Sequence, residues 1–162
     1  MPVAYLATGL DFPDALAGAA VAGAGGAPLL LVTGSAVPAA TAAELARLRP
    51  ARIVLFGTPG SVGEAVLAAL GGYTTGGVSR VTGTDRYSTA AAISAAANAP
   101  GVAVAYVATG LDFPDALAGA ALAGMTRGPL LLVTPSDLPP AAAAELTRLR
   151  PARIVILGGS GD

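Results

Sequence analysis

The sequence of 162 residues contains no cysteine, no histidine and no tryptophan, and all nine of its basic residues are arginine. The missing cysteines exclude disulfides and thiolate catalysis, and the missing histidines exclude His-based zinc sites and Ser-His-Asp triads. Only 12% of the residues are charged, and 54% are hydrophobic, a composition that excludes intrinsic disorder. The formal net charge of −1 leaves no basic surface of the kind that binds nucleic acid or an anionic membrane.

Signals that would send the chain to or across a membrane are also missing. The first twelve residues, MPVAYLATGLDF, have no basic region and no cleavage site, so they are not typical of a signal peptide. Residues 15–43 carry no charge, but they are rich in alanine and are broken by Gly-Gly-Ala-Pro at 25–28. The second copy of this segment carries Arg127, so we expect no membrane span.

A long internal repeat organises the chain. Residues 1–61 align without gaps with residues 102–162 at an offset of 101, and 42 of these 61 positions are identical. We predict two modules, 1–77 and 78–162, of which the first lacks its N-terminal Arg/Tyr helix segment and the second its final helix. The simplest interpretation is a fragment of a longer array, and a complete protein with unusual ends is the alternative.

Short apolar segments alternate with alanine-rich segments of helical length. Strands are predicted at 3–7, 29–33, 52–56, 78–82, 102–108, 130–134 and 153–157. Helices are predicted at 13–24, 38–48, 64–70, 87–97, 114–124 and 139–149, the third of them opened by a capping box from Ser61 to Glu64. This alternation predicts an α/β fold of Rossmann-like or flavodoxin-like type, in which an open parallel sheet carries helices on both faces of each tandem module.

Ligands bind beyond the carboxyl ends of the strands in open parallel sheets, so the loops there are candidate sites. The first kind of loop, TGLDFPD, supplies the candidates Thr8, Gly9, Asp11 and Asp14, and its copy supplies Thr109, Gly110, Asp112 and Asp115. These carboxylates either cap the helix that follows or form a polar ligand site with its N-terminus. We expect no catalysis, because no nucleophile, base or metal-type cluster accompanies them.

The second kind of loop is a glycine-rich turn between a strand and a helix, at residues 57–61 and 158–161. Such a turn can present backbone N–H groups to an anion, and Gly158 and Gly159 are candidates for that role. The glycine spacing does not fit a dinucleotide fingerprint, and no Gly-Lys-Ser/Thr follows, so no nucleotide cofactor is predicted. A plain tight turn is the alternative.

The third kind of loop runs from Arg80 to Ala90 and concentrates two arginines, an aspartate, a tyrosine and several hydroxyls next to a helix start. Asp85 is predicted to cap that helix, which begins near Tyr87. The guanidinium of Arg86 has fixed donors that suit a carboxylate or a phosphate. It either pairs with Asp115 of the same module, which would hold two helix starts together, or contacts a ligand directly.

Together these segments resemble the cell wall-binding type 2 repeat family. The resemblance covers essentially the whole chain. It is carried by R-x-x-G-x-x-R-Y-x-T-A at 80–90, A-T-G-x-x-F-P-D-A-L-A at 7–17 and 108–118, P-L-L-L at 28–31 and 129–132, and the Gly-Gly pair at 158–159. The first module has Gly57-Thr58 in place of this last pair, so a role for the second glycine is not expected there.

The resemblance implies a non-catalytic anchor that binds anionic secondary polymers of the cell wall without a covalent bond, a cofactor or a metal. It also implies a cell-wall or extracellular location on secreted or surface-layer proteins of Gram-positive-type bacteria. Modules of this family usually occur as three in tandem that associate as a pseudo-trimer. Two other functions stay open: a structural module that self-assembles in a surface layer, and a Rossmann-like enzyme that binds a nucleotide or phosphosugar.

Overall fold

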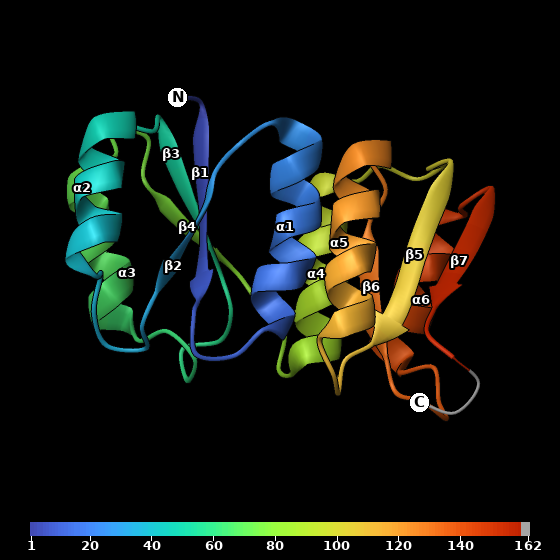
Figure 1. Ribbon diagram of the computed structural model, residues 1–162. Helices are drawn as coiled ribbons and strands as arrows, with labels where there is room; N and C mark the ends of the chain where they lie inside the picture. The colour runs from blue at the N-terminus through green and yellow to red at the C-terminus, as the bar shows by residue number, and fades with distance from the viewer. Residues whose placement is uncertain (160–162) are drawn as a thin grey trace.

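The computed structural model describes residues 1–159, which form two parallel β-sheets with helices between and outside them (Figure 1). The strands are β1 (Val3–Thr8), β2 (Leu29–Val32), β3 (Arg52–Phe56), β4 (Val78–Val81), β5 (Val104–Thr109), β6 (Leu130–Val133) and β7 (Arg153–Leu157). The helices are α1 (Pro13–Gly25), α2 (Ala39–Leu48), α3 (Glu64–Leu70), α4 (Arg86–Ala97), α5 (Pro114–Thr126) and α6 (Pro140–Leu149), with a 3₁₀ turn at Gly71–Tyr73. The predicted α/β fold is confirmed.

The first sheet has the strand order β2-β1-β3-β4, the second has the order β6-β5-β7, and every pairing is parallel. Parallel strands are joined by crossover connections, and here helices form these connections and cover the faces of the sheets. The helices α1, α4 and α5 lie between the two sheets, and α2 and α3 lie outside the first sheet (Figure 1). The largest cluster of buried apolar side chains joins the inner faces of both sheets to these three central helices.

The two copies of the alanine-rich helix, α1 and α5, pack directly against each other. Their backbones approach closely at a pair of equivalent glycines, where a Cβ added to Gly23 would lie 3.2 Å from the Cα of Gly124. A side chain at either position would force the facing backbone to shift by a few tenths of an ångström, so the two glycines allow this close contact. The repeat therefore brings its own two copies together through their smallest residues.

The segment that occurs once in the sequence connects the two sheets. Strand β4 pairs with β3 of the first sheet, although the sequence repeat counts residue 78 as the start of the second module. Helix α4 follows at once and packs on β6 and α6 of the second half as well as on α1 and β4 of the first. One continuous segment thus supplies a strand to the first sheet and a helix that lies between the two sheets, and the module boundary at 77/78 stays a prediction from the repeat.

The structure corrects one predicted helix start and confirms another. The capping box from Ser61 to Glu64 is wrong: Gly63 is the N-cap of α3 without a side-chain hydrogen bond, and the Ser61 hydroxyl donates to the Thr58 carbonyl instead. The predicted cap of α4 is confirmed, because Asp85 Oδ1 accepts from the Ser88 N–H at 2.7 Å. None of the helices within residues 1–159 combines the length and apolar character needed to span a membrane.

Candidate functional site

A polar hollow of about 360 Å³, termed the first hollow, lies where the carboxyl ends of β1 and β3 meet the starts of α1 and α4. Its lining is dominated by hydroxyls and carboxylates: Thr8, Asp11, Pro13, Asp14, Thr58, Ser61, Thr84, Asp85, Arg86, Tyr87 and Thr89. Six of the residues predicted from sequence meet here, contributed by the first TGLDFPD loop and by the segment before α4. This is the location that the strand-end rule predicts for a ligand.

The second module has an equivalent but smaller hollow of about 110 Å³, the second hollow. It contains the predicted candidates Thr109, Asp115, Gly158 and Gly159, and the remaining residues of that glycine-rich turn lie outside the described residues. The first hollow is larger because residues 84–89 form an additional wall. A complete hollow is therefore built from one module together with the segment that opens the next one.

The position of Arg86 corrects the predicted ion pair with Asp115. The guanidinium reaches across the repeat to the other module's loop, where Nη2 lies 3.5 Å from Asp11 Oδ2. Its Nη1 donates to the carbonyl of Gly110 at 2.5 Å, and its Cζ lies 5.8 Å from the ring centroid of Phe12. Arg86 thus contacts both TGLDFPD loops at once, which sequence spacing could not indicate because the two loops are far apart in the chain.

The carboxylates of the first hollow differ in their electrostatic surroundings. Burial raises the pKa of Asp14 above its usual 3.8, the neighbouring Asp11 carboxylate raises it further, and Arg86 opposes both effects. Hydrogen bonds from Ser88, first from its backbone N–H and then from its hydroxyl, lower the pKa of Asp85. With three carboxylates and one guanidinium, the hollow carries net negative charge at neutral pH.

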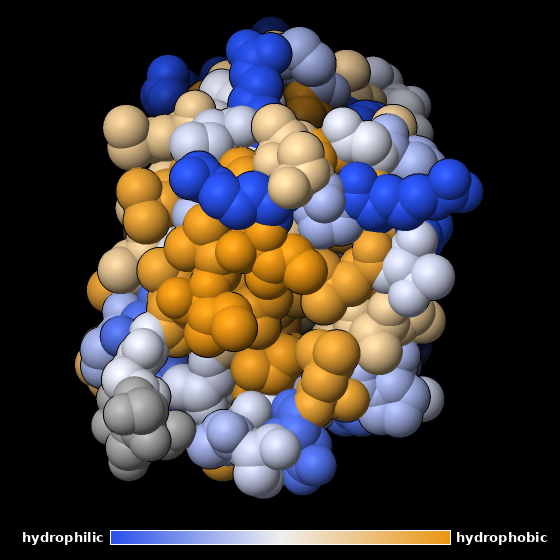
Figure 2. Space-filling view, turned by 90° about the vertical axis from the view of Figure 1, so that its right-hand side faces the viewer, coloured by the Kyte–Doolittle hydropathy of each residue, from blue (hydrophilic) through white to orange (hydrophobic). Residues whose placement is uncertain are grey.

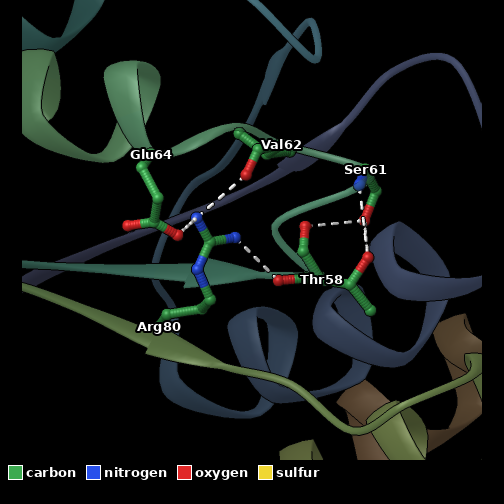
Figure 3. Close-up of polar contacts among 6 residues, drawn as sticks. Thr58, Ser61, Val62, Glu64 and Arg80 are labelled. Atoms are coloured by element: carbon green, nitrogen blue, oxygen red, sulfur yellow. Dashed lines mark hydrogen bonds and ion pairs between the residues drawn. The ribbon is translucent and has the colours of Figure 1, made fainter.

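Arg80, another predicted candidate, lies outside both hollows and braces the protein instead (Figure 3). Its guanidinium donates to the carbonyl oxygens of Gly57 and Val62 and to Glu64 Oε1, each at 2.9 Å. The side chain is only 11% exposed. These bonds fasten β4 to the turn after β3, so Arg80 positions the turn that carries Thr58 and Ser61 rather than facing a ligand.

Several backbone N–H groups at the glycine-rich turn 57–61 donate within the protein. Gly57 donates to the Val81 carbonyl, and Ser61 and Val62 both donate to the Thr58 carbonyl, all within 3.2 Å. The hydroxyls of Thr58 and Ser61 lie 3.1 Å apart. These three N–H groups are therefore used within the protein and are not available to an anion.

The other predicted candidates serve the loops themselves. Gly9 donates its N–H to the Val32 carbonyl, Asp112 Oδ1 accepts from the Phe113 N–H, and a Cβ on Gly110 would lie 2.9 Å from the Tyr87 ring. The prediction from sequence missed four hydroxyls of the first hollow: Thr58, Ser61, Thr84 and Thr89. The signal was present, because all four lie inside the loops that the sequence had already marked. Residues 1–159 contain no cluster of three or more acidic side chains placed to hold a metal ion.

Comparison with known proteins finds one family model and one curated relative that match most of the chain. The model of the family described as cell wall binding domain 2 (CWB2) matches residues 2–67 and 80–162. The amidase LytC of Bacillus subtilis is 27% identical over 157 residues, which make up 97% of this chain and 30% of LytC. The chain thus spans less than a third of that curated relative.

Two solved structures from Clostridium difficile share the fold. Cwp6 superposes with a TM-score of 0.89 at 25% identity, covering 99% of this chain and 25% of Cwp6. Cwp8 superposes with a TM-score of 0.84, also at 25% identity, covering 98% of this chain and 27% of Cwp8. The family match extends over both copies of the repeat and both hollows, so the chain belongs to the cell wall binding domain 2 family, whose role is attachment to the cell wall.

Proposed function

We propose that this chain holds its protein on the bacterial wall by binding a secondary wall polymer non-covalently in the first hollow, and that it catalyses no reaction. The observation that carries the proposal is the lining of that hollow, where five Ser/Thr hydroxyls, three carboxylates and one guanidinium converge. Hydroxyls and carboxylates are the partners that sugar hydroxyl groups need, because together they donate and accept hydrogen bonds.

The negative charge of the first hollow repels the anionic groups of the polymer, so these groups need a cation to bind. Arg86 is the one cation among the described residues that line it, and its side chain is 33% exposed. The guanidinium fork suits a phosphate or carboxylate, and the start of α4 adds a favourable dipole beside it. We therefore assign the anionic groups to Arg86 and the sugar hydroxyls to Thr8, Asp14 and the turn at 57–61.

Two hollows in one chain fit a repetitive ligand. A polymer with many equivalent units can occupy several weak sites at once, and each further contact then forms at high effective concentration. We propose the first hollow as the main site, because its lining brings together more hydroxyls and carboxylates and includes Arg86. We further propose a cell-wall location for the protein that contains this chain.

The proposal is tested by cosedimentation of the chain with bacterial walls before and after acid extraction of their secondary polymers, across a salt series. We expect saturable binding that is lost with the polymer and weakened about tenfold by Arg86→Gln or Asp14→Asn. Arg47→Ala, on the exposed surface of α2, is the matched control and should bind like the wild type. Equal binding to extracted walls, or equal binding by all variants, would overturn the assignment of the hollow.

We also propose that further modules associate with this pair, in a trimer-like arrangement. The support is a difference in cover between the two equivalent helices α1 and α5, which pack against each other. Leu16 of α1 packs against the central cluster, whereas its counterpart Leu117 on α5 is 53% exposed. A purely structural surface-layer module would show concentration-dependent self-association without any binding to walls.

A further inference from the structure

A cavity of about 560 Å³, larger than either hollow, lies between the inner face of the first sheet and the helices α1 and α4. Its deepest lining is apolar, because Ala20, Val54, Phe56 and Ile93 are each at most 5% exposed. The exposed lining residues lie at the amino ends of the strands and the C-terminal ends of the helices: Gly25, Arg52, Ser79, Ala96, Ala97 and Arg127. The cavity therefore opens at the end of the molecule opposite the first hollow.

The longest run of differences between the two copies of the repeat falls at the wall of this cavity. Residues 24–27, Ala-Gly-Gly-Ala, align with Met-Thr-Arg-Gly in the second copy. There the Thr126 hydroxyl donates to the Tyr106 hydroxyl at 3.2 Å, so a side chain at this position points toward the tyrosine. In the first copy Gly25 stands opposite Tyr5, and a Cβ added to this glycine would meet nothing within 4 Å. Small residues in the first copy thus leave the cavity open.

Two arginines give the mouth of the cavity positive charge. Arg52 is the first residue of β3, and Arg127 is the C-cap of α5. Neither arginine forms an ion pair with an acidic side chain of residues 1–159, and no aspartate or glutamate of that range lines the cavity. A guanidinium group binds the oxygens of a carboxylate or a phosphate through two parallel hydrogen bonds. An apolar cavity with a few polar groups at its opening is typical of a small-molecule site.

We propose that this cavity binds a single-chain amphiphilic anion, whose apolar chain contacts the buried lining and whose carboxylate or phosphate head group contacts Arg52 and Arg127. The driving force is burial of the chain, because the deep lining offers water no hydrogen-bonding side chain. The volume lies within the range of roughly 300–1,000 Å³ that is typical of ligand pockets. The site is independent of polymer binding, because it lies at the opposite end from the first hollow and carries the opposite charge.

Isothermal titration of the whole chain with octanoate and with octyl phosphate tests the site, and octanol is the uncharged probe. We expect one molecule of at least one of the two anions to bind per chain, and octanol to bind about tenfold more weakly, because it lacks charge-assisted hydrogen bonds. Arg127→Gly should weaken binding of the anion to the level of octanol. The matched control is Arg150→Gly, which removes an arginine from the same left-handed C-cap position of α6, outside the cavity, and should bind like the wild type.

A second pair of variants separates the cavity from the rest of the apolar surface. Ala24→Met combined with Gly25→Thr introduces the residues of the second copy, fills the cavity and should abolish binding of the anion. Amphiphiles also adsorb to exposed apolar surfaces, and the broadest one in Figure 2 lies on the side that carries β7, where Ile156 is 76% exposed. Ile156→Asp is therefore the control for adsorption and should bind like the wild type.

Four results would overturn the proposal. They are binding of neither anion, equal binding of octanol and the anion, loss of binding in Ile156→Asp, and wild-type binding by the filled variant. If the filled variant does not fold, Arg127→Gly and Arg150→Gly decide, because equal affinity of these two variants for the anion also contradicts the proposed site.

Discussion

Two arginines with similar ion pairs should differ sharply in their effect on stability. Arg47 forms two bonds to Glu44, at 2.7 and 2.6 Å, whereas Arg80 forms one bond to Glu64 and two to backbone carbonyls, all at 2.9 Å. By distance alone the pair at Arg47 is the stronger one. The side chains differ in exposure, however, with 69% for Arg47 and 11% for Arg80.

The magnitude follows from the partners that each substitution leaves behind. Removing Arg80 leaves two carbonyl acceptors in a partly buried turn without their donors, at about 1.5 kcal/mol for each hydrogen bond to a charged group. The bond to Glu64 adds little, because that carboxylate is 65% exposed. Arg80→Ala should therefore lower the free energy of unfolding by about 3 kcal/mol, a large part of the stability of a typical domain.

Urea denaturation followed by circular dichroism measures the difference. Arg80→Lys should recover part of the loss, because an ammonium group keeps the charge but cannot reproduce the guanidinium fork. Arg47→Ala should leave the midpoint almost unchanged, since an exposed i,i+3 pair exchanges its partner for water. If Arg80→Ala and Arg47→Ala shift the midpoint equally, the reasoning from burial and carbonyl bonding is refuted.

Three further substitutions test the hollow and the helix contact. Asp14→Asn should raise the melting temperature at pH 7, because burial raises the pKa of Asp14 and thus disfavours its ionised form in the folded protein. This gain in melting temperature should vanish below pH 3.8, where the carboxyl is protonated even in the unfolded chain. Asp85→Ala should lower the free energy of unfolding by about 1 kcal/mol, because it removes the side-chain cap of α4. Since hydrogen bonds from Ser88 lower the pKa of Asp85 in the folded protein, this contribution should be complete above pH 3.8 and disappear as the pH falls through the folded-state pKa, which urea midpoints measured across acid pH would show. Gly124→Val should cost about 1–3 kcal/mol by thermal unfolding, because its side chain meets Gly23 of the other helix, whereas Gly25→Ala, with open space around it, should not.

The positions of the strands and helices were predicted best from the sequence. Alternation of short apolar segments with alanine-rich ones predicted each strand and helix to within a few residues, because burial on both sides and helix caps act over short distances. The failure at Ser61 is instructive, since the hydroxyl had a nearer partner in Thr58 than the helix N–H groups. Loops at the strand ends that the sequence marked as candidates line the first hollow, and their contact with a ligand stays a prediction.

What the sequence by itself determined is the repeat, the α/β fold with parallel strands and the loops that supply the first hollow. Only the tertiary structure decided which of the two copies each strand, helix and arginine contacts. It placed β4 in the first sheet and α4 against the second, turned Arg86 toward Asp11 instead of Asp115, and set Arg80 in a brace rather than in the hollow. The physical reason is that these choices depend on which buried surfaces and carbonyl groups remain uncovered after the local elements form, and that depends on contacts between residues far apart in the chain.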